Sequence, residues 1–364
     1  MQTFFIVAIL ALGFLITFQI AKASEYVSVI RGEEKARKQT NKINGFLLLL
    51  FLILGLIGVW YCNDKLRGKI LPESASVEGV YIDNMMWITL AMTGFVFLIT
   101  QIALFWFCYK YQESDKRKPY YYPHNNKLEL IWTVIPAIAL SVLVGFGLYY
   151  WFRITGDAPK DAMRVEVTGK QFGWEFRYPG KDGVIGKKYF KRIDPSKNNP
   201  LGQLWEDPHN YDDVYVEGEL HLVVNRPVEL VIGSKDVIHD VGLPHFRMKM
   251  DAVPGTPTTM CFTPRFTTKD MIEKTGNPKF VYELSCDQMC GKGHTGMRGI
   301  VIVESQVDYD AWIASRDPQY YVAFPEKNPN KPVTPSPAKT DTSVKATGST
   351  TPAATGTAQA KTKQ

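Results

Sequence analysis

Four long apolar segments occupy most of the first 152 residues and constrain the fold more than any other feature. They cover residues 4–20, 45–62, 85–108 and 130–152. None has Lys, Arg, Asp or Glu in its interior, and each has roughly the ~20-residue length that a bilayer-spanning helix needs. Aromatic residues gather at their ends, as at a membrane–water interface. We therefore predict four transmembrane helices, the alternative being four buried core helices.

Basic residues between these segments indicate their orientation. Residues 31–42 carry five Lys and Arg and residues 110–118 carry four, whereas residues 63–84 carry three together with four acidic residues. Because cytoplasmic loops hold an excess of Lys and Arg, the first and third loops are predicted to be cytoplasmic, and the chain after about Arg153 to lie outside. Residues 21–23 resemble a signal-peptide cleavage site, but no positive charge precedes the first segment, so we expect a retained helix.

The pattern changes at about Met163. Short segments now alternate apolar and polar residues, with Pro and Gly between them, which is typical of a sandwich or barrel. These segments are residues 163–180, 219–225, 227–234, 263–269, 279–285 and 299–305. We predict an all-β Greek-key sandwich or barrel over residues 158–310, with residues 180–216 as a polar insertion outside its core.

Residues 325–364 consist mainly of Pro, Thr, Ala, Lys and Ser and have too little apolar bulk to fold, so we predict a disordered tail. The formal net charge is +6, and its basic residues flank the apolar segments or lie in this tail. No single basic face with interleaved aromatic residues is present, so nucleic-acid binding is not expected.

A glycine-rich stretch, CDQMCGKGHTGM at residues 286–297, contains Cys286, Cys290, His294 and Met297. Thiolate and thioether ligands favour copper, and imidazole is compatible with it. Zinc would accept the cysteines and the histidine, but a thioether is a poor ligand for it. A disulfide is the simpler alternative for the cysteines, but it explains neither the histidine nor the methionine. We therefore predict a copper site, in which two thiolates could bridge two ions.

Two bridged copper ions would each need a terminal histidine, so a second histidine is expected upstream. The candidates are His209, His221, His239 and His245. His239 ends the strand-like run VELVIGSKDVIH and leads into a turn containing Gly and Pro. In cupredoxin-like sandwiches one histidine comes from such an early loop, and the other ligands come from a late loop between the last two strands. We predict His239, with His245 as the alternative.

The motif C-x-x-x-C-x-x-x-H-x-x-M, preceded by DVIH and DAVPG, resembles cytochrome c oxidase subunit II, the copper A (CuA) subunit of haem-copper respiratory oxidases. The resemblance runs from about Met85 to Val307 and includes NNKLELIWTVIPAI and the aromatic segment GKQFGWEFRYPG. It implies a transmembrane hairpin over residues 84–152 and a cupredoxin-like domain over residues 158–310. Residues 1–62, predicted to form two extra helices joined by a cytoplasmic loop, lie outside it, as does the tail.

The resemblance also implies roles for individual residues. Two cysteines would bridge two copper ions, and two histidines would be the terminal ligands. A methionine and a main-chain carbonyl would be weaker ligands. In this chain these residues are, in the same order, Cys286, Cys290, His239, His294, Met297 and Gln288. Phe172 stands where the family has the tryptophan through which electrons enter, and Trp174 follows in the same motif. Glu129 matches an acidic residue at the mouth of a proton channel in the catalytic subunit. It could instead favour the helix N-terminus through the dipole.

Three positions depart from the family. Gln288 replaces a glutamate that helps to hold a magnesium or manganese ion, and a neutral amide is a weaker partner for a hard cation, which puts that ion in question. Phe172 is smaller than tryptophan and has no indole N–H, so the contact with the electron donor would differ. Thr256 replaces the arginine that usually follows DAVPG.

The implied function is that of the subunit through which electrons enter a haem-copper oxidase. Its partners would be the catalytic subunit I, which reduces O2 to water and pumps protons, other oxidase subunits, and membrane lipid. No C-x-x-C-H haem motif occurs, so the donor is expected to be a separate cytochrome c, or a cytochrome c domain of an associated respiratory complex. The expected location is a bacterial inner membrane, with the copper domain outside. The alternatives are a copper-free subunit II of a quinol oxidase and a membrane copper-binding module.

Overall fold

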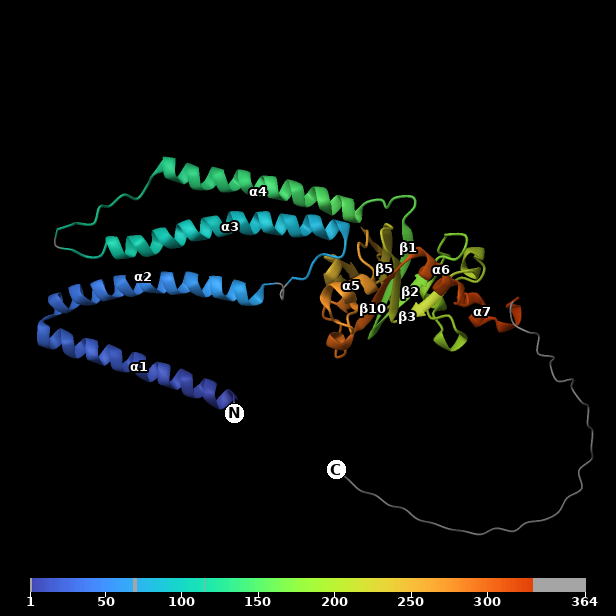
Figure 1. The fold of residues 1–364 in the computed structure, drawn as a ribbon, viewed down its shortest axis with the longest axis horizontal. Coiled ribbons are helices and arrows are strands. Elements are labelled where there is room, and N and C mark those ends of the chain that lie inside the picture. Colours follow the sequence, from blue (N-terminus) through green and yellow to red (C-terminus); the bar gives the residue numbers. More distant parts are fainter. Residues whose placement is uncertain (1, 68–70, 115, 330–364) are drawn as a thin grey trace, which may run out of the picture. The chain divides into compact units, whose positions relative to one another are not determined.

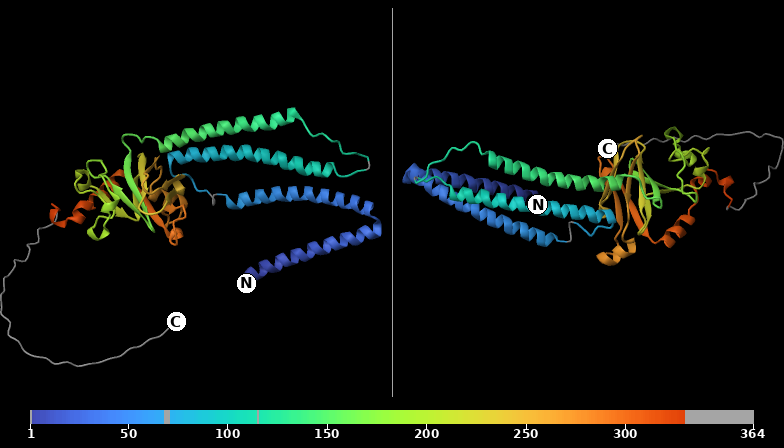
Figure 2. Two further views of the ribbon diagram at one scale, coloured as in Figure 1. Left: turned by 180° about the vertical axis from the view of Figure 1, so that it is seen from behind. Right: turned by 90° about the horizontal axis from the view of Figure 1, so that it is seen from above.

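The computed structural model describes residues 2–67, 71–114 and 116–329. The chain divides into two units, Met1–Ala323 and Phe324–Gln364. The larger unit begins with four long helices and continues into a β-domain (Figures 1 and 2). Of the predicted disordered tail, only residues 325–329 are described, and Pro325–Lys327 forms the short 3-10 helix η6. The rest of that prediction lies outside the described residues.

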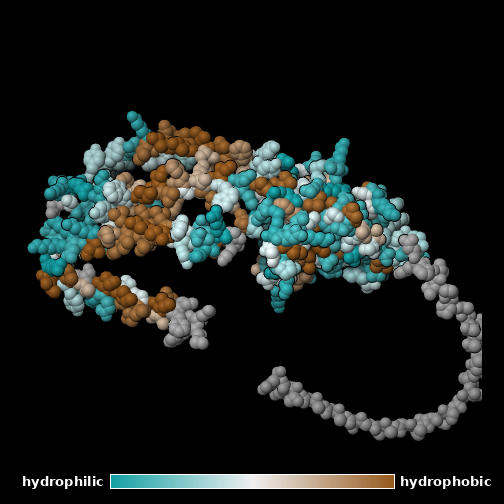
Figure 3. All heavy atoms as spheres, viewed as in Figure 1, coloured by the Kyte–Doolittle hydropathy of each residue, from teal (hydrophilic) through white to brown (hydrophobic). Residues whose placement is uncertain are grey.

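The four predicted membrane helices are confirmed. They are α1 (Gln2–Arg31), α2 (Glu33–Leu66), α3 (Val77–Lys110) and α4 (Asn126–Thr155). Each is long and apolar enough to cross a membrane. Figure 3 shows their apolar side chains on the surface, where lipid or neighbouring subunits would cover them. Side chains cap two of the N-termini, because Ser76 accepts from the Gly79 N–H and Asn125 accepts from the Leu128 N–H.

The first connecting loop is much shorter than predicted. Residues 31–42 were expected to be a loop, but only Gly32 separates α1 from α2, with a φ of 84° that favours glycine. Helix α2 begins at Glu33 because two acidic residues occupy its first turn, and an ion pair of 2.7 Å joins Glu34 to Lys38 one turn later. The basic residues therefore lie on helix ends rather than in a loop, which leaves the charge asymmetry unchanged.

The β-domain is a sandwich of two five-stranded sheets, as predicted. One sheet has the order β3-β2-β1-β5-β8, and the other has the order β4-β10-β9-β6-β7. The strands are β1 (Met163–Lys170), β2 (Gly173–Tyr178), β3 (Val214–Glu217), β4 (Glu219–Val223), β5 (Val228–Ser234), β6 (His239–Leu243), β7 (Met248–Ala252), β8 (Thr258–Phe262), β9 (Tyr282–Cys286) and β10 (Arg298–Glu304). Strand β1 pairs in parallel with β5, and β10 pairs in parallel with β4, whereas the other pairs are antiparallel.

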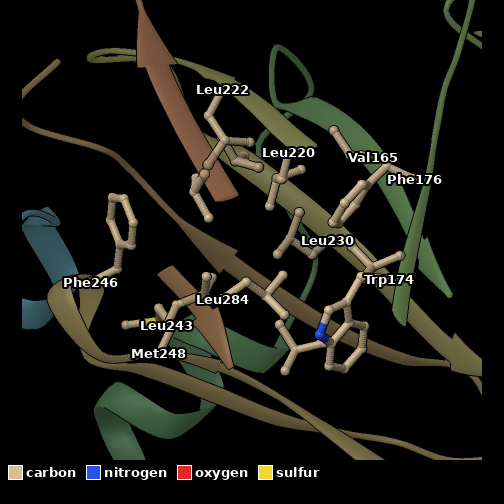
Figure 4. Packing of buried hydrophobic residues seen from close by; sticks show 14 of the residues in the cluster. Val165, Trp174, Phe176, Leu220, Leu222, Leu230, Leu243, Phe246, Met248 and Leu284 are labelled. Atoms are coloured by element: carbon tan, nitrogen blue, oxygen red, sulfur yellow. The ribbon is translucent and has the colours of Figure 1, made fainter. Parts of the chain in front are cut away.

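The hydrophobic core lies between the two sheets. Alternate residues of each strand point inward, so that Val165, Phe176 and Leu230 from the first sheet meet Leu220, Leu222 and Leu284 from the second (Figure 4). Phe246 and Met248 fill one end of the core, and Trp174 lies toward the other (Figure 4). The core is packed with fully buried aliphatic and aromatic side chains, which makes the domain a rigid support for the loops that leave its strands.

Several local predictions were wrong. The aromatic segment over residues 163–180 is a hairpin of β1 and β2 rather than one strand, with Gln171 and Phe172 in the turn. The segment over residues 263–269 is not a strand, because helix α5 (Thr268–Thr275) begins within it. Thr267 and Asp270 form a reciprocal capping box at the start of α5, and this favours helix over strand there.

Two short 3-10 helices lie between strands. Helix η4 (Pro244–Phe246) joins β6 to β7, and η5 (His294–Gly296) lies in the loop before β10.

Two further α-helices follow the last strand, α6 (Gln306–Ala314) and α7 (Gln319–Ala323). Trp312 of α6 stacks on His221 of β4 with ring centroids 3.7 Å apart. The folded domain therefore extends past the predicted limit at residue 310.

The insertion over residues 180–216 was predicted to lie outside the core, but part of it is built into the domain. It contains the 3-10 helices η1 (Phe190–Arg192), η2 (Pro195–Lys197) and η3 (Pro208–Tyr211), and its last residues form β3 of the first sheet. A buried ionic network attaches it to the sheet, because Arg177 of β2 pairs with Glu166 at 2.7 Å and with Asp213 at 3.1 Å. Arg177 also donates to Asn210 at 3.0 Å. The insertion thus contributes buried polar groups to the domain instead of lying outside it.

Candidate metal centre

The predicted ligand residues come from two neighbouring strands and the loop that follows them. His239 is the first residue of β6, and Cys286 is the last residue of β9. These strands pair antiparallel, with Val241 opposite Cys286, so the histidine and the cysteine lie at the same end of the sheet. The loop from β9 to β10 then returns over this end and brings the remaining residues to it, Cys290, His294 and Met297.

The side chains of these residues converge. The Sγ atoms of Cys286 and Cys290 are 3.8 Å apart. Nδ1 of His239 lies 3.8 Å from the first sulfur, and Nδ1 of His294 lies 3.6 Å from the second. Two further donors complete the cluster, since Sδ of Met297 is 3.8 Å from the Cys290 sulfur and the carbonyl oxygen of Gln288 is 3.2 Å from the Cys286 sulfur. All six predicted ligand residues therefore meet at one place.

Spacings of this size fit donors that share a metal ion. Two ligand atoms on one tetrahedral ion, with bonds of about 2.0–2.3 Å, lie roughly 3.3–3.8 Å from each other. Each sulfur has an imidazole nitrogen of its own at such a distance, and the sulfurs have each other. Among the described residues, His239, Cys286 and Cys290 are the group of three or more His, Cys, Asp or Glu whose donor atoms lie close enough to hold an ion.

The two cysteines are buried free thiols rather than a disulfide. Cys286, Cys290 and Met297 are buried, His239 is fully buried, and His294 is partly exposed. Burial raises the pKa of the Cys290 thiol to about 11, and the neighbouring Cys286 adds to this shift. A metal ion that binds here must therefore displace thiol protons.

A hydrogen-bond network supports the cluster from the side of the β1–β2 turn. Oδ1 of Asp236 is 2.8 Å from Nε2 of His239, the ring nitrogen that faces away from the sulfurs. Its other oxygen, Oδ2, accepts from the Gln171 N–H at 2.7 Å. Burial raises the pKa of Asp236, but the bonds from Gln171 and His239 outweigh it and hold this pKa below its ordinary value. Neither Asp236 nor Gln171 was predicted from the sequence, since no spacing connects them with the proposed ligands.

The other residues singled out from the sequence are distributed as follows. Phe172 is 43% exposed, and its ring packs on Gly293 in the loop between β9 and β10, residues 287–297, which is called the ligand loop below. Trp174 is fully buried and meets the ring of His239 edge to face, with centroids 6.0 Å apart. His245, the alternative ligand, instead contacts the rings of Phe280 and Tyr282. Of the four upstream histidines considered, His239 is therefore the one that the structure places at the cluster.

Glu129 lies in the first turn of α4 and is exposed. Its Oε1 accepts from the backbone N–H of Asn125 at 3.3 Å, while the Asn125 side chain accepts from the Leu128 N–H at 3.0 Å. Glu129 therefore helps to cap the N-terminus of α4, where its charge also suits the dipole role that was considered as the alternative.

Comparison with known proteins identifies the family. Residues 71–149 match the transmembrane domain of cytochrome c oxidase subunit II, and residues 163–305 match its periplasmic domain. The chain belongs to the cytochrome c oxidase subunit II family. Within the family, it is 37% identical over 234 residues to the alternative cytochrome c oxidase subunit 2 of Bradyrhizobium diazoefficiens, covering 64% of this chain and 79% of that one.

Other subunit II sequences are more distant. The cytochrome c oxidase subunit 2 of Thermostichus vulcanus is 28% identical over 283 residues, which cover 72% of this chain and 82% of that one. Among solved structures, the periplasmic domain of subunit II from Bradyrhizobium japonicum is 20% identical, with a TM-score of 0.30, covering 44% of this chain and 96% of that one.

Membership of the subunit II family defines the general role of the chain. It is the subunit through which electrons enter a haem-copper oxidase, and it works as part of an oxidoreductase complex with other oxidase subunits. Its helices and its matched domains make it a membrane protein with an exported C-terminal domain, as the charge asymmetry predicted. The cluster of His239, Cys286 and Cys290 is consistent with the copper site of this family.

Proposed function

We propose that the cluster holds a binuclear copper centre of the CuA type. The thiolates of Cys286 and Cys290 would bridge two copper ions, with His239 and His294 as terminal ligands through Nδ1. The observation that carries this proposal is the pairing of each sulfur with an imidazole nitrogen of its own, at 3.8 and 3.6 Å, around two sulfurs 3.8 Å apart. A site for a single copper ion would not need a separate imidazole nitrogen beside each of two sulfurs.

The remaining two donors complete the proposed ligand set. Met297 lies on the side of Cys290, and the Gln288 carbonyl lies on the side of Cys286, so each ion would receive one weaker ligand. When bound, the copper pair supplies one-electron redox chemistry: it takes one electron from a donor and gives one to a haem. The chain supplies a largely buried, preformed set of donors on two paired strands and the loop that follows them, which limits rearrangement between the two redox states.

The copper proposal is tested on the purified full chain in detergent. We expect two copper ions per chain, a purple colour, and an electron paramagnetic resonance spectrum of one electron shared by two coppers. Cys290→Ser should abolish the shared-electron spectrum, because only one bridging thiolate remains. A single blue copper would contradict the binuclear centre, and a chain that takes up no copper would favour the copper-free, quinol-oxidase type of subunit.

We also propose that the electron donor is a cytochrome c or a cytochrome c domain of an associated respiratory complex. Phe172 supports this role as the residue through which electrons enter, since it is exposed on one side and packs on the ligand loop on the other. The two extra helices and the structured insertion provide surfaces for a stable partner in a bacterial inner membrane. Purification of the oxidase in mild detergent tests this, and full turnover with soluble cytochrome c and no co-purifying complex would oppose a tightly bound donor.

Glu129 is proposed to lie at the mouth of a proton channel of the catalytic subunit. Glu129→Gln keeps a side-chain oxygen that can accept from the Asn125 N–H while it removes the charge. If the proton role is real, this variant slows oxygen reduction by the assembled oxidase without loss of copper. An unchanged rate would leave helix capping as the role of Glu129.

We propose that Gln288 weakens any magnesium or manganese site next to the copper site. The side chain of Gln288 is exposed and has no carboxylate to offer such an ion. Metal analysis of the assembled oxidase, compared with a Gln288→Glu variant, tests this point. We expect the variant to retain more of the hard metal than the wild type, whereas equal occupancy would show that residue 288 does not decide its binding.

A further inference from the structure

Asp236 connects a proposed copper ligand to the turn that carries Phe172. One carboxylate oxygen, Oδ1, is 2.8 Å from Nε2 of His239, and the other, Oδ2, accepts from the backbone N–H of Gln171 at 2.7 Å. The two groups that it joins come from different sheets, since His239 begins β6 and Gln171 follows β1. The carboxylate therefore bridges the two layers of the sandwich beside the cluster.

Gln171 carries the connection on to a second proposed ligand. Its side-chain Nε2 donates to the carbonyl oxygen of Cys290 at 2.5 Å. The path His239–Asp236–Gln171–Cys290 thus begins and ends at the copper cluster and passes through the turn. Phe172 is the next residue of that turn, and its ring packs on Gly293 of the ligand loop. Movement of the turn would consequently disturb the exposed aromatic residue and the ligand loop together.

A purely local role does not account for this arrangement. Asp236 does stabilise its own turn, since the Val237 N–H donates to Oδ1 at 2.7 Å. A purely local role would need only that bond to the next residue and would leave the second oxygen to solvent. Here the second oxygen binds a residue 65 positions away in the chain. Lys235, the adjacent cation, pairs with Glu175 instead, so ring nitrogen and amide groups are the donors that face the Asp236 carboxylate.

We propose that Asp236 is a positioning residue that fixes the His239 imidazole and, through Gln171, the Phe172 turn. A carboxylate on the outer nitrogen of a ligating histidine sets the tautomer with Nδ1 free for the metal and raises the basicity of the ring. The proposal rests in part on the proposed copper centre, but the bridge to Gln171 is a property of the chain itself.

The variant Asp236→Asn tests the bridge with little change of shape. An amide offers one acceptor oxygen where the carboxylate offers two, so it cannot accept from both His239 and Gln171. We expect weaker copper retention, by about 10–100-fold in competition with a chelator, because loss of a second-shell partner has effects of that size. The reduction potential of the copper centre should rise as well, because a less basic His239 imidazole stabilises the oxidised centre less.

Asp287→Asn is the matched control. Asp287 adjoins Cys286, carries the same charge and bonds to the Ser285 hydroxyl at 2.7 Å, and none of its bonds reaches His239 or Gln171. It reports the effect of removing a nearby charge alone. If both variants shift the potential and the copper affinity equally, Asp236 acts only as a charge and the proposal is overturned.

A second measurement uses the copper-free full chain and separates this proposal from the copper proposal. Hydrogen exchange, followed by mass spectrometry of peptides that cover the β1–β2 turn, reports whether the Gln171 N–H is protected. We expect faster exchange there in Asp236→Asn and unchanged exchange in Asp287→Asn. Unchanged exchange in both variants would refute the bridge whether or not the chain binds copper. A failure of the wild type to take up copper would instead count against the proposed centre.

Discussion

The ring of Phe172 lies against Gly293, so closely that a β-carbon built on Gly293 would come within 2.5 Å of ring atoms. Phe172 is in the turn between β1 and β2, and Gly293 immediately precedes the proposed ligand His294. A glycine is required here because the approaching ring occupies the space that any side chain would need. The exposed aromatic residue and the ligand loop are therefore in direct contact, with no other side chain between them.

Gly293→Ala should disturb this contact. The added methyl group would push the Phe172 ring outward or displace the ligand loop, at a cost of about 1–3 kcal/mol in the free energy of unfolding. We expect slower reduction of the copper centre by the donor, measured by stopped-flow absorbance. Gly296→Ala is the control, because a β-carbon at that position has no atom within 4 Å. Equal effects of the two substitutions would mean that the contact with Phe172 is unimportant for electron transfer.

Substitution of Phe172 itself distinguishes a path for electrons from simple packing. Phe172→Trp restores the larger ring and the indole N–H found elsewhere in the family, so reduction by a cytochrome c donor should become faster. Phe172→Leu keeps apolar bulk without an aromatic ring and should slow it, while the copper spectrum stays the same in both variants. Phe190→Leu replaces another exposed aromatic residue, 69% exposed in the insertion, and should have no effect. A rate that is insensitive to residue 172 would place the electron path elsewhere.

The parts of the structure that the sequence predicted correctly are those that depend on local pattern or on donor chemistry. The apolar runs became helices because a helix satisfies all its backbone hydrogen bonds within one segment, as a bilayer requires. The proposed ligand residues were recognised because Cys286, Cys290, His294 and Met297 combine soft donor atoms with a spacing that few other sites share. His239 followed from the order of ligands along the chain rather than from any local signal.

The contacts that were missed are long-range. Gln171 and Cys290 are 119 residues apart, and nothing in either segment indicates that one side chain binds the backbone of the other. The insertion looked like a polar excursion because charged residues such as Asp213 gave no sign of burial, which depends on pairing with Arg177 of β2. Helix α5 was different, since its capping box could have been read from Thr267 and Asp270.

Met297→Leu should separate the proposed thioether ligand from its role in packing. Met297 is buried, so leucine of similar volume should cost less than about 1.5 kcal/mol in stability. The copper pair should remain bound through its stronger ligands, while its absorption spectrum and reduction potential change because a weak ligand has been lost. Met260→Leu makes the same replacement in the core strand β8, where Met260 is fully buried, and should leave both properties unchanged. Identical spectra for the wild type and Met297→Leu would argue against ligation by the thioether.

Asp213 should make the stability of the exported domain depend on pH. Burial raises the pKa of Asp213 to about 7 from an ordinary value near 3.8, although Arg177 opposes this shift. The unfolded chain therefore releases the Asp213 proton at lower pH than the folded chain. Between about pH 4 and pH 7, the contribution of this group to stability should decrease as pH rises, by on the order of 1–4 kcal/mol in total.

Asp213→Asn should remove this component, so that the free energy of unfolding of the variant falls less steeply with rising pH than that of the wild type. Denaturant titrations of the full chain in detergent, followed by tryptophan fluorescence, give the two profiles. Asp194→Asn is the control in the same insertion, because bonds from Ser196 and Lys197 hold the pKa of Asp194 below its ordinary value. Its contribution is present above about pH 4 and is lost only as pH falls further, so its profile should parallel the wild type between pH 4 and 7. Parallel profiles for Asp213→Asn and the wild type would instead mean that Asp213 remains ionised in its pair with Arg177 across this range.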